Sequence, residues 1–278
     1  MYKRRFYRCM PYLLVIVGMV VMVYPLIWLF FSAFKTGDEI FYTARLLPER
    51  FSFDGFRDGW RSVGMFTFTT FFINTFRIVL PMVAFSIISN TVIAYGFARF
   101  KFFAKKQLFA IMLSTMMLPS SVMLIPRYIM FRDLGWLDSY LPLIMPTVFG
   151  MPFFIFMLVQ FFRGIPRELD ESATIDGCNS LRVLIFIILP LSKPALFSIG
   201  LFQFMWAWND FLLPFIYISS VSRFPLALGL RLTLDVTTAV SWNNILAMAL
   251  VSMTPLVLLF FFAQRYFIEG IVTTGIKG

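Results

Sequence analysis

The sequence predicts an all-α membrane protein with six transmembrane helices and a short cytoplasmic helix between the fourth and fifth. Hydrophobic residues make up 60% of the 278 residues and charged residues only 14%, and the mean hydropathy is strongly positive. A soluble fold with a solvated exterior needs more polar surface than this. Several uncharged runs are long enough to cross a bilayer, where lipid offers backbone groups no partner and a helix is required. A polar segment, residues 163–182, interrupts these runs.

The first span, residues 11–34, has 24 residues without a charge. At about 1.5 Å per residue, a helix of this length covers about 36 Å, more than a hydrocarbon layer of about 30 Å. It exceeds the apolar core of a signal peptide, so we expect it to be retained. Similar runs predict spans at residues 78–98, 107–126, 139–162 and 236–264. The fifth span is shorter, and we expect one helix from residue 190 to about residue 213, with Lys193 reaching the membrane interface.

Basic residues are held on the cytoplasmic side during membrane insertion, and their distribution predicts the orientation. With both termini inside, the inside segments hold fourteen basic and five acidic residues, and the outside segments hold nine of each. We expect a cytoplasmic N-terminus at residues 1–10, a membrane domain at residues 11–268 and a cytoplasmic tail at residues 269–278. The basic excess lies in short loops beside anionic lipid headgroups, so no nucleic-acid partner is expected.

Residue types that carry chemistry are few in this chain. The sequence has no histidine, the commonest general base and metal ligand, and no GxxxxGK[ST] phosphate-binding loop. Cys9 and Cys178 lie in predicted cytoplasmic segments, where disulfides are rare, so we expect free thiols. Outside the fifth span the long apolar runs contain no carboxylate. The sequence therefore predicts no catalytic site, no metal and no cofactor in this chain.

The polar segment between the fourth and fifth spans predicts a short helix. Gly164-Ile165-Pro166 ends the fourth span and places Pro166 at a first helical position, where its missing N–H costs nothing. Gly177 can adopt the left-handed conformation that ends a helix. Acidic side chains in the early turns complement the positive end of the helix dipole; they are Glu168, Asp170 and Glu171.

One side of this helix is apolar, because Ile165, Leu169 and Ala173 recur every four residues. A helix that rests on the membrane surface is one interpretation of this pattern. Such helices are usually rich in Lys and Arg, whereas this one carries acidic residues where the lipid is anionic. We therefore favour a helix that fits into a groove of a protein partner.

Polar side chains within or near the spans have two interpretations. They can line a route for a solute, or they can bond neighbouring helices. The candidates for a solute route are Asn74, Gln203, Trp208 and Asn209. Arg77, near the outer end of the second span, is more simply interpreted as an arginine that reaches the outer headgroups.

The residues in and after the polar segment resemble a known motif. Their order is similar to the EAA motif of the membrane subunits of binding-protein-dependent ABC importers, and they are Glu171-Ser172-Ala173, Gly177, Ile187 and Leu189-Pro190. Ser172 stands where the family usually has its first alanine, and both residue types are small. Other stretches resemble the carbohydrate branch, the maltose and glycerol-phosphate type; they are residues 95–100, 125–126, 165–177, 208–214, 264–270 and 275–278.

The resemblance implies a coupling helix, within a coupling segment at residues 163–190, that sits in a cleft of a separate ATPase. In this family Glu171 would anchor the helix by charged hydrogen bonds, and Ser172 and Ala173 would permit close approach. Gly177 would turn the chain towards the fifth span, which Leu189-Pro190 would start. The coupling residues carried over by position are Leu169, Glu171, Ser172, Ala173, Asp176, Gly177, Ile187, Leu189 and Pro190.

The resemblance also implies three protein partners. They are an ATPase dimer that binds ATP and Mg, a second homologous permease subunit, and an extracytoplasmic solute-binding protein. The binding protein would dock on the outside segments, residues 35–70 and 211–235. The assembly would import a sugar or related small solute across the cytoplasmic membrane of a bacterium or archaeon.

Two other classes of protein remain open. A secondary transporter or channel that works alone should show inverted repeats, broken helices near the midplane or buried ionisable relays. The sequence has no convincing internal repeat, and its buried charges are too few for proton coupling. A membrane scaffold or receptor subunit would leave the EAA-like motif unexplained. Co-purification of an ATPase would separate the three classes.

Overall fold

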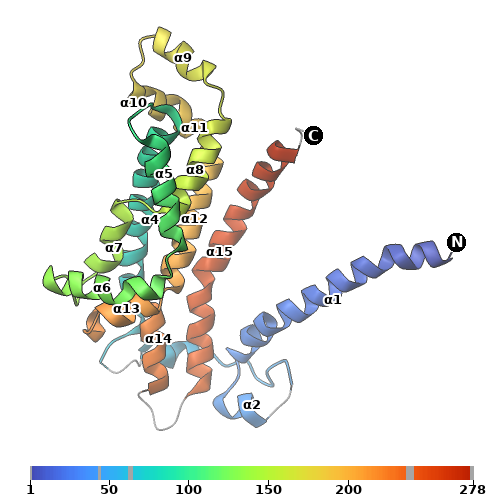
Figure 1. The fold of residues 1–278 in the computed structure, drawn as a ribbon. Helices are drawn as coiled ribbons and strands as arrows, with labels where there is room; N and C mark the ends of the chain where they lie inside the picture. The colour runs from blue at the N-terminus through green and yellow to red at the C-terminus, as the bar shows by residue number, and fades with distance from the viewer. Residues whose placement is uncertain (1, 43–44, 62–64, 236–240, 276–278) are drawn as a thin grey trace. The chain divides into compact units, whose positions relative to one another are not determined.

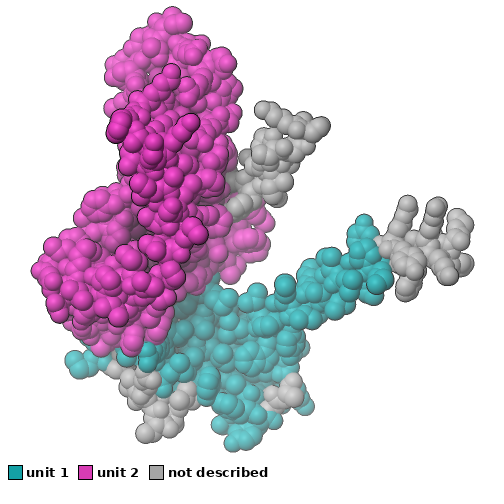
Figure 2. Space-filling model, viewed as in Figure 1, with its two compact units in different colours: residues 1–70, 229–255 teal, residues 71–228, 256–278 magenta. Residues whose placement is uncertain are grey.

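The computed structural model describes residues 2–42, 45–61, 65–235 and 241–275 of the chain (Figure 1). Regular structure within these ranges is helical and includes no β-strand, which confirms the all-α class. The chain groups into two compact units: unit 1 is residues 1–70 with 229–255, and unit 2 is residues 71–228 with 256–278 (Figure 2). The domain boundaries at residues 10 and 268 stay predictions.

Four segments are long and apolar enough to cross a membrane, and two bent helix pairs raise the number to six if each pair is one span. The four are Met10–Ser32, Phe68–Arg99, Leu141–Gly164 and Trp242–Gln264. The bent pairs are Lys105–Met117 with Ser120–Asp133, and Ser180–Leu191 with Lys193–Asn209. These segments follow the order of the six predicted spans, although the start of the predicted run 236–264 lies outside the described residues.

The helices in chain order are α1 (Tyr2–Ser32), α2 (Gly37–Tyr42), α3 (Asp54–Arg61), α4 (Phe68–Arg99), α5 (Lys105–Ser114), η1 (Thr115–Met117), α6 (Ser120–Asp133), α7 (Leu141–Val148), α8 (Pro152–Gly164), α9 (Glu168–Ile175), α10 (Ser180–Val183), η2 (Leu184–Ile188), α11 (Leu189–Leu191), α12 (Lys193–Asn209), α13 (Leu212–Tyr217), η3 (Val221–Arg223), α14 (Leu226–Asp235) and α15 (Trp242–Gly275). Here η1 and η3 are 3₁₀ turns, and η2 is a π-helical turn.

The third predicted span, residues 107–126, is not one straight helix. η1 ends at Met117, and α6 begins at Ser120 after a bend of 100°. Pro119 accounts for the break because proline disfavours helical conformation in the residue before it, and Leu118 is extended, with ψ 123°. The uncharged run therefore covers both arms of a bent pair.

The prediction of one helix at residues 190–213 is wrong. η2 and α11 lead to Ser192, where the chain bends by 79° into α12. Pro194 accounts for this bend, since its ring would clash with the carbonyl group of Pro190 in a continuous helix. α12 ends at Asn209, and Asp210 is extended, so the next turn of helix is the separate α13.

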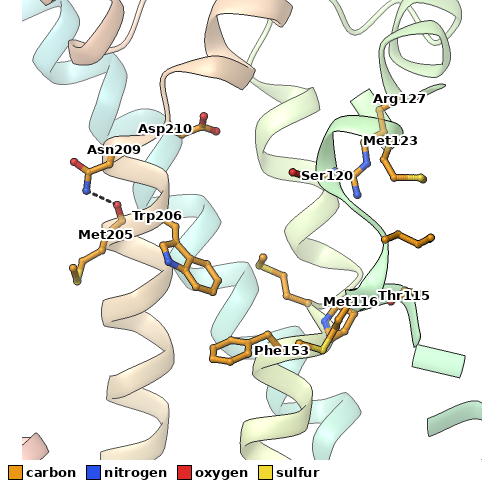
Figure 3. A pocket seen from close by; sticks show the side chains of 13 residues that line it. Thr115, Met116, Ser120, Met123, Arg127, Phe153, Met205, Trp206, Asn209 and Asp210 are labelled. Atoms are coloured by element: carbon orange, nitrogen blue, oxygen red, sulfur yellow. Dashed lines mark hydrogen bonds between the residues drawn. The ribbon is translucent and has the colours of Figure 1, made fainter. Parts of the chain in front are cut away.

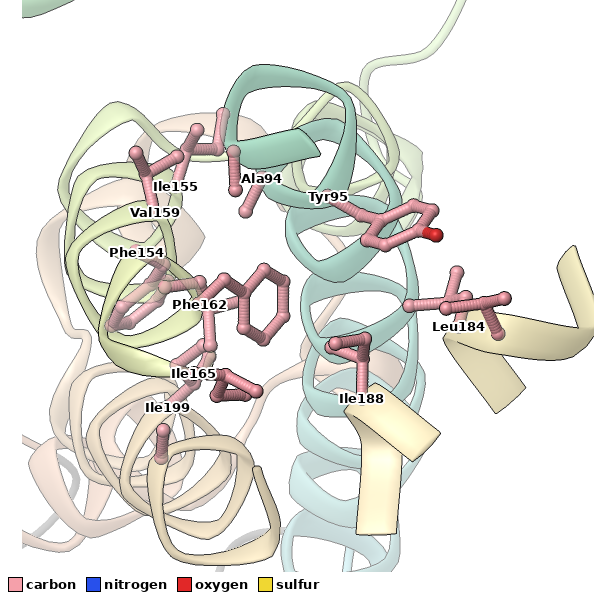
Figure 4. Close-up of a cluster of buried hydrophobic side chains, with 14 of the residues drawn as sticks. Ala94, Tyr95, Phe154, Ile155, Val159, Phe162, Ile165, Leu184, Ile188 and Ile199 are labelled. Carbon is pink, nitrogen blue, oxygen red and sulfur yellow. The ribbon is translucent and has the colours of Figure 1, made fainter. Parts of the chain in front are cut away.

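The core of unit 2 lies where α4 and α8 meet the segment from α9 to α12. Its buried apolar side chains form one cluster (Figure 4), to which α4 contributes Ala94, Tyr95 and Ala98, and α8 contributes Phe154 and Phe162 among others. The chain between α8 and α12 adds Ile165, Ala173, Leu184 and Ile188 to the same cluster. The polar segment between the fourth and fifth predicted spans is therefore packed against α4 and α8.

A polar contact between α4 and the break at α7 and α8 holds another part of unit 2. Asn90 is fully buried, and its Oδ1 accepts a hydrogen bond from the Met151 backbone N–H at 2.7 Å. Ser89 Oγ donates to the Thr147 carbonyl oxygen at 2.9 Å. Between them Gly150 has φ +83°, and an added Cβ would lie 2.7 Å from Ile93 Cδ1. The break is therefore a defined conformation fixed from α4.

Unit 1 contains α1, α2, α3 and the first part of α15. Gly55 and Gly59 lie one turn apart on α3 and face α15. A Cβ on Gly55 would lie 2.7 Å from the Asn243 carbonyl oxygen, and one on Gly59 would lie 2.9 Å from Met248 Cγ. The glycines therefore permit a close approach of the two helices.

Candidate functional site

The short helix α9 lies at the end of unit 2 where α4 and α8 also end (Figure 1). Ile165 is extended, with ψ 126°, and Arg167 already has helical dihedrals, so the helix begins immediately after Pro166. The sequence predicted Pro166 as a first helical residue, but the helix begins one to two residues after it. Glu168, Asp170 and Glu171 occupy the first turn, as expected for a helix N-terminus.

The end of α9 is a complete Schellman motif. Gly177 has φ +83°, its N–H bonds the Thr174 carbonyl oxygen at 3.1 Å, and the Cys178 N–H bonds the Ala173 carbonyl oxygen at 2.9 Å. The expected left-handed turn at Gly177 is present. Since a side chain at this position would be strained, the glycine sets the direction in which the chain leaves α9.

The apolar stripe of α9 faces inwards. Ile165 and Ala173 are buried in the unit 2 cluster, whereas Leu169 is 41% exposed. Ile165 and Ala173 are therefore not available to a partner, because their own chain covers them, and the prediction that the helix fits a partner's groove stays a prediction for its exposed side. The stripe attaches the helix to the membrane helices.

The outer side of α9 is exposed and carries both apolar and acidic groups. Ile175 is 87% exposed, and Glu171, Ser172 and Asp176 are exposed as well. The carboxylates of Glu171 and Asp176 form no hydrogen bond or ion pair within the part of the chain that the structure describes. An exposed isoleucine beside unpaired carboxylates outside a membrane span is a suitable surface for a protein partner.

The chain that follows α9 is regular but not α-helical throughout. Asn179 Oδ1 caps α10 by accepting the Arg182 N–H at 2.9 Å. Ile187 and Leu189, both half-buried, fall in η2 and at the start of α11, and Pro190 is exposed. The motif residues after Gly177 therefore lead into the bend at Ser192 and do not begin α12.

An open cavity of about 1140 Å³ lies elsewhere in unit 2 (Figure 3). It is lined where three helical segments break or end: at η1 and α6, at the start of α8, and at the end of α12. Trp206 points from α12 into the space that faces Ser120 and Met123 of α6, with Phe153 of α8 below it (Figure 3). Irregular backbone within a membrane protein is tolerated where it lines such a cavity.

The polar groups of the cavity include side chains that the sequence reasoning missed. Arg127, Asn209 and Asp210 all line it. Only Asn209 was among the predicted route residues, and its Nδ2 donates to the Met205 carbonyl oxygen at 2.8 Å. The missed signal was Pro119, which ends a helix in the middle of an uncharged run and so marks the backbone that lines the cavity.

The three other predicted route residues lie away from the cavity lining. Asn74 is buried and its Nδ2 donates to the carbonyl oxygens of Ser222 (2.8 Å) and Phe224 (3.1 Å). Trp208 is buried against a cluster of phenylalanine rings, Phe72, Phe76 and Phe204. Gln203 is 2% exposed, and its Oε1 has no hydrogen-bond partner among the described residues. Their role in a solute route stays a prediction.

A second polar cluster joins the loop between α6 and α7 to the loop after α13. The Asp138 carboxylate accepts hydrogen bonds from the Ser219 N–H (3.0 Å), the Ser220 N–H (2.8 Å) and the Ser220 hydroxyl (2.6 Å), and it pairs with Arg223 at 3.0 Å. The Ser220 hydrogen bonds, with smaller contributions from Ser219 and Arg223, lower the pKa of Asp138. Arg77, exposed on α4, donates to Asn74 Oδ1 at 3.4 Å.

Within the described residues, no group of three or more His, Cys, Asp or Glu side chains could hold a metal ion. Cys178 is a half-buried free thiol, and the side chain of Cys9 lies outside the described residues. The predictions of no metal and no cofactor stay predictions.

A comparison with known families shows to which family the chain belongs. The family described as "Binding-protein-dependent transport system inner membrane component" matches residues 90–272. The chain belongs to this family. The resemblance seen in the sequence is therefore confirmed, and the permease is embedded in a membrane. Membership in a binding-protein-dependent system also implies ATPase and solute-binding partners.

Individual relatives of the permease are ABC transporter permeases, and several are named for sugars. It is 31% identical over 261 residues to the probable ABC transporter permease protein YurM of Bacillus subtilis (strain 168), covering 94% of this chain and 85% of the relative. It is 30% identical over 277 residues to the galactooligosaccharides transport system permease protein GanQ of the same organism, covering 99% and 98%. These relatives place the permease in the sugar ABC transporter permease family.

A solved structure has the same fold. It is a bacterial ABC transporter involved in the import of the acidic polysaccharide alginate, and its chain matches with a TM-score of 0.86 and 22% identity. The match covers 96% of this chain and 98% of that one. The predicted permease fold is therefore confirmed over almost the whole sequence.

Proposed function

We propose that this chain is the permease subunit of an importer driven by a separate ATPase, which docks on the outer side of α9. The observation that carries the proposal is the two-sided character of this helix. Ala173 and Ile165 join α9 to the core of unit 2, while Leu169, Glu171 and Ile175 are available to a partner. A helix attached in this way can pass a displacement to the membrane helices without bending at its base.

The ATPase would be a dimer that binds ATP and Mg, and this chain would have no nucleotide site of its own. A second homologous permease would complete the membrane part. The solute-binding protein would dock on the opposite face, at residues 35–70 and 211–235, and both termini would be cytoplasmic. The basic excess in the predicted inside segments supports this orientation.

The solute is proposed to be a sugar or a related small molecule, since curated relatives are named for galactooligosaccharides and arabinooligosaccharides. The cavity beside Trp206 is the part of this chain best suited to the route. Aromatic faces and amide or charged groups suit a polyhydroxylated solute, and Trp206, Phe153, Asn209 and Arg127 supply them.

The proposal is tested with the permease assembled with its partners in proteoliposomes. Glu171→Lys and Gly177→Val are expected to leave the protein in the membrane but to raise the ATP hydrolysed per solute transported. Glu168→Lys is the control, because it makes the same charge change on the same helix outside the motif. Normal coupling in both motif variants, at normal assembly, would contradict the proposal.

A transporter that works alone is the second candidate, because broken helices beside a cavity also occur in secondary transporters. That class leaves the exposed side of α9 without a role. Gentle purification of the tagged permease separates the two: an ATPase that co-purifies in stoichiometric amount supports the importer. Solute uptake by the purified chain alone, driven by an ion gradient, would establish the alternative.

A further inference from the structure

The last turns of α4 contact both ends of the segment that contains α9. Arg99 Nη2 donates to the Ile165 carbonyl oxygen at 3.0 Å, immediately before α9. Arg99 Nε lies 2.7 Å from Asp170 Oδ2, within the first turn of α9. On the far side, Tyr95 Oη donates to the Ser180 carbonyl oxygen at 3.1 Å, where α10 begins.

The Arg99–Asp170 ion pair differs from the other ion pairs of the described chain in its burial. The Arg99 side chain is 5% exposed and the Asp170 side chain 21%, whereas the exposures are 59% and 61% for Arg132 and Asp133. Exposed pairs contribute little because water and salt screen them. The buried guanidinium donates one hydrogen bond, to the Ile165 carbonyl oxygen, and faces the Asp170 carboxylate as an ion pair, while Arg99 Nε and Asp170 Oδ1 have no hydrogen-bond partner among the described residues. Its planar shape restrains the two groups relative to each other more than a flexible ammonium group would.

Apolar packing surrounds these polar contacts. Ala94, Tyr95 and Ala98 of α4 belong to the same buried cluster as Ile165 and Ala173, and Figure 4 shows Tyr95 and Ile165 within it. Close-packed interiors transmit displacement because they have little free volume. The last turns of α4 and the whole of α9 therefore have few ways to move independently.

An earlier residue of α4 connects this helix with the cavity lining. Asn90 accepts the hydrogen bond of the Met151 N–H at 2.7 Å, and Met151 lines the cavity. From Asn90 to Arg99 the helix is continuous. A displacement at α9 thus has a direct structural path to the cavity lining that does not pass through the bend at Ser192.

We propose that α9 and the last turns of α4 move as one rigid body, with Arg99 as the positioning residue and its pair with Asp170 as the latch. The inference rests on the proposed function, since it names a path by which work from the ATPase reaches the cavity. The latch itself is a property of this chain and can be measured without transport.

The measurement uses spin labels on two exposed positions in the assembled complex in lipid nanodiscs. Phe103→Cys, four residues beyond α4, and Thr174→Cys, in the last turn of α9, are both exposed, and neither is among the residues proposed to meet the ATPase. The native Cys9 and Cys178 are changed to serine. A single narrow distance distribution is expected, with the same mean in the nucleotide-free state and after ATP–vanadate trapping. A mean that differs between the two states would overturn the rigid body.

Asp170→Asn removes the charge of the latch with almost no change in shape, and Glu168→Gln is the matched control on the same helix. The distance distribution is expected to broaden in Asp170→Asn and to match the parent in Glu168→Gln. ATP hydrolysed per solute is expected to rise about 2- to 30-fold in Asp170→Asn. Equal distributions in the two variants, or a broader one with unchanged coupling, would overturn the latch. Unchanged coupling in both Glu171→Lys and Gly177→Val would instead refute the proposed function and leave the distance result standing.

Discussion

At the scale of single residues, two glycines with the same backbone conformation have different surroundings. Gly150 and Gly177 both have φ +83°. A Cβ on Gly177 would meet nothing within 4 Å, whereas one on Gly150 would lie 2.7 Å from Ile93 Cδ1 and 3.1 Å from Ile155 Cδ1. Backbone strain acts at both positions, and crowding acts only at Gly150.

Alanine substitution should separate these two effects. Gly177→Ala is expected to cost about 1–2 kcal/mol through the left-handed backbone, and Gly150→Ala about 1–3 kcal/mol more through overpacking. The check is thermal unfolding of the purified permease in detergent. Adding Ile93→Val to Gly150→Ala should recover part of the loss, because it removes the nearest atom. Equal losses in both single variants would show that crowding is absent.

Two tryptophans two residues apart on α12 should also behave differently. Trp206 is 45% exposed and lines the cavity, whereas Trp208 is 5% exposed among phenylalanine rings. Trp208→Ala is expected to destabilise the permease by about 3–5 kcal/mol. Trp206→Ala should change the KM for solute uptake, and it should cost less stability than Trp208→Ala because Trp206 is more exposed, although its ring also contacts Phe153 and Phe154. Unfolding and uptake are measured on both, and an unchanged KM in Trp206→Ala would argue against the cavity as the route.

At the scale of elements, uncharged runs predicted the existence and order of the spans, but not their breaks. Pro119 and Pro194 fall within or beside the runs, and run length and hydrophobicity do not reveal such breaks because they ignore a single missing N–H. The end of α9 was predictable because Gly177 acts locally. Arg127 was not, since its place in a cavity depends on helices that are distant in the sequence.

The loop cluster around Asp138 should make stability depend on pH. Hydrogen bonds from Ser220 and Ser219 lower the pKa of Asp138, so its contribution is present above the ordinary Asp pKa of about 3.9 and is lost as pH falls through the lower folded value. The side chain is 34% exposed, so we expect less than about 1 kcal/mol. This contribution is measured as the difference in the free energy of unfolding between the parent and Asp138→Asn, from pH 6 to pH 3. The variant should be less stable at pH 6, and the difference should narrow as the pH falls below about 3.9; parallel curves would contradict this.

At the scale of the whole molecule, unit 2 of the permease combines a closely packed end around α9 with a cavity lined by helix ends. Around α9 the chain is closely packed and capped, and the Arg99–Asp170 pair is buried. Around the cavity, α6, α8 and α12 begin or end, and residues at these helix ends line it. A displacement applied at the closely packed end therefore has its largest consequence where the helices are already interrupted, which is the arrangement an alternating route requires.

This arrangement is useful only if α9 is cytoplasmic, and chemical labelling can test that. Fourteen basic and five acidic residues in the predicted inside segments, against nine of each outside, predict that Ile175 lies inside and Ser222 outside. With Cys9 and Cys178 changed to serine, single cysteines at these exposed positions are introduced into the permease, which is expressed without its ATPase so that Ile175 is not covered, and are treated with a membrane-impermeant maleimide. Ser222→Cys should react in intact cells, and Ile175→Cys only after permeabilisation. The reverse pattern would place α9 on the side without ATP and would refute its role as the docking site of an ATPase.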